Sequence, residues 1–177
     1  MATISMSTDS TSNANAGTGN KQIRGALTVL QNDINMVDAI AANGGTALAA
    51  NDIIEAIAVP ANTLILHAGF KVVTAMAGTT TDSEIHLGIT GTDVDIFATA
   101  FDLDGASVGA HTPAITSSGV CSNLPVFTAS ADTIDVEIQA SGGTITGGVI
   151  RVYAVCLMMD NISQSASANE VDRDLLA

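Results

Sequence analysis

Basic side chains are scarce in this sequence of 177 residues. Only five Lys and Arg stand against 18 Asp and Glu, which gives a formal charge of −13. Nucleic-acid binding needs several cations that neutralise phosphates, so we expect no nucleic-acid partner. The chain also has no Trp, one Tyr and four Phe. These are too few rings for a surface that stacks on sugars or bases.

Long apolar runs and a targeting segment are missing as well. The best apolar window, residues 149–159, contains Arg151 and is shorter than the roughly 18 residues of a membrane-spanning helix. The first residues lack the basic start and apolar centre of a signal peptide. We therefore expect a soluble protein made in a cytoplasm, with no membrane partner. Because 47% of the residues are hydrophobic, the chain can build a globular core.

Cysteine occurs only twice, as Cys121 and Cys156. Two cysteines this far apart are neither a disulfide framework nor a metal-ligand motif. One disulfide between them and two reduced thiols both remain open, and a cytosolic protein favours the buried, reduced thiols.

Alternation of apolar and polar residues is the main positive pattern. It is clear at 63–73, 84–90 and 131–139, where every second side chain would face a core. Segments 52–59 and 149–159 are apolar on both faces, as in strands covered on both sides. The pattern predicts an all-β fold, an antiparallel β-sandwich. We favour a jelly roll over an immunoglobulin-like sandwich because long connections, within 91–130, interrupt the strand pairs.

The two ends of the sequence differ in composition from its middle. Residues 1–20 are almost entirely Ser, Thr, Asn, Ala and Gly, and cannot bury enough apolar area to offset the entropy lost on ordering. We therefore divide the chain into an N-terminal arm at 1–50, a β-sandwich at 51–160 and a C-terminal tail at 161–177. Within the arm, 26–30 resembles a short strand and 33–42 has some helical spacing.

Several residues are candidates for an interface with a partner. The arm contains more apolar residues than a solvated segment would keep, so we predict that it orders on a partner through Leu27, Val29, Leu30, Ile34 and Val37. Arg151 stands alone in the apolar segment 149–159. We predict that it is a buried or interfacial salt-bridge partner rather than an anion site.

Catalytic motifs are missing from the sequence. It contains no nucleophile elbow, phosphate-binding loop, zinc-protease motif or dinucleotide-binding loop. We therefore predict no enzymatic activity, no catalytic residues and no cofactor. Of the three histidines, His67 and His86 would point outward from adjacent strands, and His111 lies in a loop region. Neither a third ligand nor a His-x-His pair accompanies them, so we predict no metal site there.

Two pairs of closely spaced carboxylates resemble parts of calcium-binding loops. They are Asp93 with Asp95, and Asp102 with Asp104, but neither continues into the full loop pattern. We predict no bound metal, while calcium held between subunits stays open because a charge of −13 attracts cations.

Three stretches resemble small structural proteins of tailed bacteriophages. They are 51–69 with the string VPANT, 130–136 with ADTI, and 147–156 with IRVYA after a Gly-rich turn. The resemblance covers about residues 50–160. It implies a virion protein that decorates and cements the phage head, with the major capsid protein as partner.

Charge and apolar surface extend this expectation. A charge of −13 suits the outer face of a capsid rather than a surface facing packaged DNA. Strands that are apolar on both faces predict self-association, and we expect a homotrimer because capsid lattices offer three-fold positions. The alternative is a tail or fibre module that contacts a host receptor or glycan, against which the scarcity of aromatic residues weighs.

Overall fold

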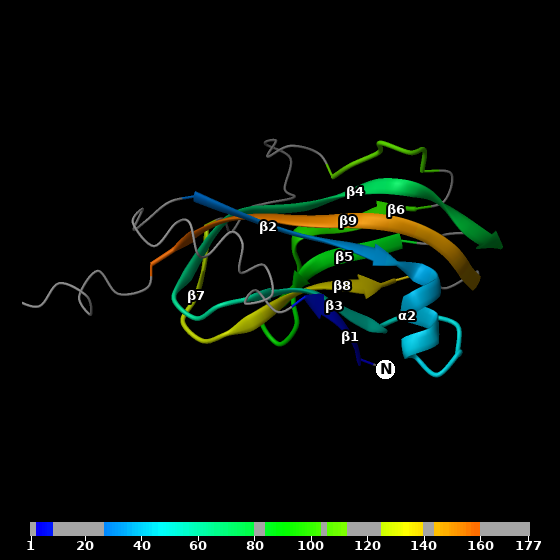
Figure 1. Cartoon of the computed structure of the whole chain (residues 1–177), viewed down its shortest axis with the longest axis horizontal. Helices are drawn as coiled ribbons and strands as arrows, with labels where there is room; N and C mark the ends of the chain where they lie inside the picture. The colour runs from blue at the N-terminus through cyan, green and yellow to red at the C-terminus, as the bar shows by residue number, and fades with distance from the viewer. Residues whose placement is uncertain are drawn as a thin grey trace, which may run out of the picture.

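The protein is a two-layer β-structure in the computed structural model, which describes residues 3–8, 27–79, 84–103, 106–112, 125–139 and 144–159. These residues form nine strands and one short helix (Figure 1). In chain order they are β1 (Thr3–Thr8), β2 (Leu27–Asn35), α2 (Met36–Ala42), β3 (Ile53–Val59), β4 (Thr63–Thr79), β5 (Glu84–Ile89), β6 (Asp93–Asp102), β7 (Val126–Thr128), β8 (Asp132–Ile138) and β9 (Thr144–Met158).

The strands pair in a nested order. The innermost pair is β5 with β6, and around it lie β4 with β7, β3 with β8, and β2 with β9, all antiparallel. Rolling up such a long hairpin gives one sheet in the order β2-β9-β4-β7 and another in the order β1-β3-β8-β5-β6. This is the jelly-roll arrangement. The predicted antiparallel sandwich is confirmed, and among the described strands only β1 pairs in parallel, with β3.

The predicted boundary at residue 50 is wrong. Strand β2 lies beside β9 over its whole length, from Leu27 opposite Leu157 to Asn35 opposite Val149, and is therefore part of the sandwich. Its alternation is hard to see in the sequence because a polar residue, Asn32, takes an inward position. The Asn32 side chain donates a hydrogen bond to the carbonyl oxygen of Ala56 at 2.9 Å.

The ends of the chain are described only in part. Strand β1, inside the predicted arm, is the edge strand of the five-stranded sheet, next to β3. Residues 9–26 and the predicted C-terminal tail at 161–177 lie outside the described residues.

The core fills the space between the sheets and is mainly aliphatic. Most inward apolar side chains of both sheets are buried, and Phe70 packs edge-on against Phe101 with ring centroids 4.6 Å apart. Helix α2 lies at one end of the sandwich (Figure 1), with Met36 and Ala39 buried. The Asn35 side chain caps this helix by accepting a hydrogen bond from the Val37 backbone N–H at 3.0 Å.

Several local features of the sequence are found where they were expected. The turn predicted at 60–62 joins β3 to β4, with Asn62 in the left-handed region at φ 56°. Strands β6 and β7 lie at sheet edges within the segment predicted to hold edge strands, although β6 has ten residues. Among the described residues, no helix has the length and apolar character needed to cross a membrane.

Candidate interaction surface

Apolar side chains form a row across one end of the four-stranded sheet, on the face away from the core. The register places Leu27 of β2 beside Leu157 of β9, Leu157 beside Leu64 of β4, and Leu64 beside Phe127 of β7. Leu27 and Phe127 are 63% and 52% exposed. Since directly opposed residues share a face of the sheet, one apolar row spans all four strands.

A second, shorter apolar row lies next to the first. Val29 of β2, 60% exposed, is opposite Val155 of β9, and Val155 is opposite His67 of β4. A bulge in β4 between Ile65 and His67 interrupts the register here. We call these two rows, formed by Leu27, Val29, Leu64, Phe127, Val155 and Leu157, the apolar patch.

Polar and aromatic groups follow in the next row along the same face. Tyr153 lies between Gln31 and Gly69, and its hydroxyl is 3.5 Å from Nε2 of His67. The side chains of Thr112 and Tyr153 lie directly against Gly69. A Cβ at this position would overlap both of them, so a residue without a side chain is required. Burial lowers the pKa of His67, which therefore stays neutral near pH 7.

A charged row follows on this face. Arg151 of β9 lies between Asp33 of β2 and Lys71 of β4. Its Nε and a terminal nitrogen donate to the two oxygens of Asp33 at 2.6 and 2.8 Å, a two-point ion pair that lowers the pKa of Asp33. Both side chains are more than two-fifths exposed. Arg151 is thus an exposed ion-pair partner of Asp33, so of the two predicted alternatives the buried salt bridge is wrong, and the interfacial one stays a prediction.

Replacement of Asp33 by Asn should lower the free energy of unfolding by less than about 1 kcal/mol, because solvent screens an exposed ion pair. The pKa of Asp33 is lowered in the folded protein, so the contribution is present near neutral pH and is lost as the carboxylate protonates in acid. Urea unfolding of both proteins near pH 7 and in acid measures the difference. A loss that persists in acid would contradict the electrostatic explanation.

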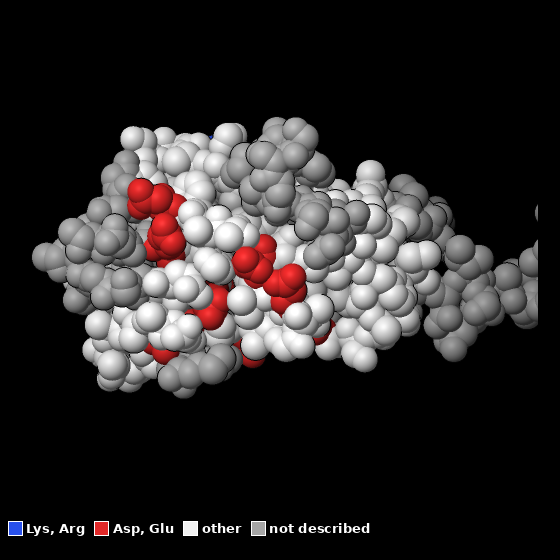
Figure 2. Space-filling view, turned by 180° about the vertical axis from the view of Figure 1, so that it is seen from behind, with Lys and Arg blue, Asp and Glu red and all other residues white. Residues whose placement is uncertain are grey.

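The other sheet carries the opposite charge balance. Its strands hold the acidic residues Glu55, Glu84, Asp93, Asp95, Asp102, Asp132, Asp135 and Glu137, and no Lys or Arg. The strands of the four-stranded sheet hold one acid, Asp33, and two cations, Lys71 and Arg151. Figure 2 shows a side of the molecule where acidic residues gather with almost no basic ones. Charge is therefore segregated between the two layers.

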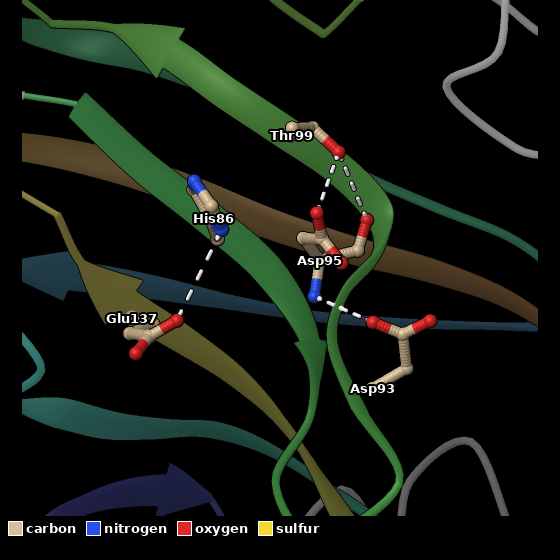
Figure 3. Close-up of polar contacts among 5 residues, drawn as sticks. All are labelled: His86, Asp93, Asp95, Thr99 and Glu137. Atoms are coloured by element: carbon tan, nitrogen blue, oxygen red, sulfur yellow. Dashed lines mark hydrogen bonds and ion pairs between the residues drawn. The ribbon is translucent and has the colours of Figure 1, made fainter.

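A polar group on the five-stranded sheet centres on His86 (Figure 3). Its Nδ1 is 4.0 Å from Oε2 of Glu137, too far for a hydrogen bond, and both atoms are buried without a hydrogen-bond partner. On the neighbouring strand, the Thr99 hydroxyl donates to Asp95 at 3.0 Å. Hydrogen bonding between Asp93 and Asp95 raises the pKa of Asp93 and lowers the pKa of Asp95.

The first residues of β6 cover part of this face. Gly88 of β5 is opposite Asp135 of β8, and a Cβ on Gly88 would overlap the backbone of Asp93 and Val94. The backbone of β6 therefore passes directly over Gly88, beside the Asp135 side chain. As a result, Asp135 is only 3% exposed although it does not face the core. One of its oxygens accepts a hydrogen bond from the Thr90 N–H at 3.0 Å, and the other has no partner.

Replacement of Asp135 by Asn should stabilise the protein near neutral pH by about 1 kcal/mol, since it removes a buried charge and keeps the acceptor for Thr90. Burial raises the pKa of Asp135. A carboxyl group whose pKa is raised by folding stabilises the folded state at pH values below its pKa in the unfolded chain. This stabilisation is lost as the pH rises through its pKa in the folded protein. The gain from Asn should therefore disappear in acid.

Urea unfolding at about pH 3 and pH 7 tests this expectation. Asp132→Asn on the same strand is the matched control, because Asp132 is exposed. It should change the free energy of unfolding by less than about 0.5 kcal/mol at either pH. A stabilisation by Asp135→Asn that is equal at both pH values would count against a buried, titrating Asp135.

The predicted interface residues separate into two groups. Leu27, Val29 and Arg151 lie on the outer face of the four-stranded sheet, and Val37 is 52% exposed on α2. Leu30 and Ile34 are 6% and 0% exposed and face the core of the same chain, so as interface residues they are wrong. The sequence did not indicate Phe127 and Leu64 as interface residues. The segment 149–159, which is apolar on both faces, did indicate that its outer face needs a cover.

Other candidates from the sequence do not come together. His67 lies on β4 and His86 on β5, which belong to different sheets, so the expectation that they are adjacent is wrong. The backbone of His111 forms an isolated antiparallel β-bridge with the backbone of Lys71. Within the described ranges, no three His, Cys, Asp or Glu are placed to hold a metal ion. Asp104 and Cys121 lie outside those ranges, whereas Cys156 is a free buried thiol with a pKa raised to about 11 by burial.

Comparison with known proteins identifies the same fold in two phage capsids. No protein-family model and no curated protein matches the sequence. A chain in the capsid asymmetric unit of cyanophage Pam1 is similar, with a TM-score of 0.56 and 14% identity. A chain in the capsid of Ralstonia phage GP4 is similar with a TM-score of 0.52 and 19% identity. Each match covers 77% of this chain and 87% of the other, and at these identities it defines the fold.

Proposed function

We propose that this chain is a structural virion protein that binds the outer surface of a phage capsid and stabilises the head lattice. The observation that carries the proposal is the shared jelly roll, which spans most of a chain in each of two phage capsids. Because 77% of this chain corresponds to 87% of the matched chain, the matched chains are shorter than this one. A small, separately folded subunit suits a decoration protein.

The surface of the described residues supports the same role. Its most distinctive feature is an exposed apolar patch on the outer face of the four-stranded sheet, which fits binding to another protein. Side chains are not gathered there in an arrangement suited to catalysis, and we propose a non-enzymatic role. The charge of −13 suits the outside of the head, since packaged DNA would repel it.

We further propose that the partners are the major capsid protein and two more copies of this chain. The apolar patch of one copy is small, so each contact with the capsid is weak. Three linked copies at a three-fold position would bind together, and their avidity would exceed that of a single copy. Sedimentation equilibrium of the purified protein tests the trimer, and a monomer that also sits singly on the particle would overturn it.

A cryo-electron microscopy reconstruction of the phage that encodes this chain tests the main proposal. We expect density of the jelly roll on the outer face of the head, at repeated lattice positions. Heads that lack the protein should lose this density and rupture at lower temperature. Density inside the shell would overturn the outer location, and density confined to the tail would favour a receptor-binding module instead.

A further inference from the structure

The apolar patch contains half of the large hydrophobic side chains that are exposed among the described residues. The described residues include six large hydrophobic side chains that are exposed. Leu27, Val29 and Phe127 belong to the patch, and Met159 follows β9 at the same end. The other two, Val37 and Val108, lie on α2 and in the segment 106–112. Exposed apolar area is thus concentrated at one end of one sheet.

Charge indicates which way this sheet faces. The acidic residues of the described strands are almost all on the five-stranded sheet, whereas the four-stranded sheet carries Asp33 against Lys71 and Arg151. Covering the acidic sheet would remove water from many carboxylates that no Lys or Arg on its strands can pair with, and this costs free energy. The four-stranded sheet can be covered without that cost.

The size of the patch argues against a second copy as its only cover. The first row crosses four strands and the second only two, so the patch spans at most about 19 by 14 Å from ordinary strand and residue spacings. A stable protein pair buries about 800 Å² on each partner, which is more than this area. A partner that presents many fixed binding positions can use a small contact, because linked contacts add up.

We propose that the apolar patch is the surface that docks on the capsid shell, leaving the acidic five-stranded sheet toward solvent. This rests on the proposed function. The apolar patch would fit a surface of the shell protein that is apolar and uncharged where it faces the two rows. Beside it, the shell protein presents a hydrogen-bond acceptor or carboxylate to Lys71, which makes no ion pair within the described residues.

Cosedimentation with heads of the encoding phage that lack this protein tests the docking surface. Val29→Lys and Phe127→Lys each place a charge in the patch at a side chain that is at least half exposed, so both variants should fold. Val108→Lys is the matched control, with the same substitution at a residue that is 65% exposed and outside the patch. Circular dichroism and urea unfolding verify that all three variants are folded.

We expect the two patch variants to bind the heads more than about tenfold more weakly than the unmodified protein, and Val108→Lys to bind within about twofold. Equal binding by every variant would overturn the docking surface and leave the proposed function intact. Absence of binding by the unmodified protein would overturn both. If Val29→Lys instead converts an oligomer to a monomer before any heads are added, the patch is covered by a second copy and the proposal is wrong.

Discussion

Replacement of Phe70 by Ala is expected to lower the free energy of unfolding by about 3–5 kcal/mol. Phe70 is fully buried on β4, opposite Val152 of β9, and its ring contacts the edge of Phe101. The substitution removes this burial and leaves a cavity between the sheets. Because a domain of this size is stable by about 5–15 kcal/mol, a loss of that size is a large part of the total.

Phe127→Ala is the control for this experiment. It makes the same chemical change at a side chain that is 52% exposed, so the expected effect is within about 0.5 kcal/mol. Phe70→Leu keeps much of the side-chain volume and gives a measurable intermediate loss if Phe70→Ala does not fold. Urea unfolding followed by circular dichroism measures all three. Similar losses at positions 70 and 127 would contradict the assignment of the core.

Replacement of Gly88 by Ala is expected to lower the free energy of unfolding by about 1–3 kcal/mol. The upper end is expected because the new methyl group would overlap backbone atoms, which cannot move aside as a flexible side chain can. A methyl group at this position overlaps the backbone of Asp93 and Val94, so the start of β6 must move away from β5. That movement would also admit water to Asp135, whose register partner is Gly88. The substitution should therefore weaken the pH dependence that Asp135 gives to stability.

Gly147→Ala is the matched control, because its nearest neighbours would be 3.7 Å from the new methyl group. Its stability should stay within about 0.5 kcal/mol of the unmodified protein. A double-mutant cycle with Asp135→Asn separates the two effects of Gly88→Ala. If Asp135→Asn stabilises the protein equally with and without the Gly88→Ala substitution, β6 does not shield the carboxyl group.

The sequence predicted most of the strands, because burial on one face leaves a period of two. Strands β3, β4, β5, β8 and β9 occupy the segments that were expected, although β4 continues beyond the alternating segment 63–73 and β9 begins before the apolar segment 149–159. Strand β2 lies in the segment assigned to the arm, where Gln31, Asn32 and Asp33 follow one another and Asn32 points inward. A core strand can contain an inward polar residue when its side chain forms a hydrogen bond with a backbone carbonyl group. Alternation of apolar and polar residues does not indicate such a strand.

The candidate surface was predicted only in part. The double apolar character of 149–159 indicated that the second face of this strand needs a cover, and Leu27 and Val29 were candidates. What the sequence could not supply is register, which brings Leu64 and Phe127 into the same row. The burial of Asp135 was also out of reach, since it depends on a strand that crosses the face at a glycine.

The nested pairing of the strands has a consequence for the order of folding. The β5–β6 hairpin closes the shortest loop, whereas β2 and β9 join residues far apart, such as Asp33 and Arg151 at a separation of 118 positions. Loop-closure entropy therefore favours the inner pair first and the outer pair last, in a slow reaction typical of β-sandwiches. The row from Leu27 to Leu157 exists only once that last pair has formed. A chain released early from synthesis, or cut near either end of the sandwich, would lack the row, so attachment would select finished molecules.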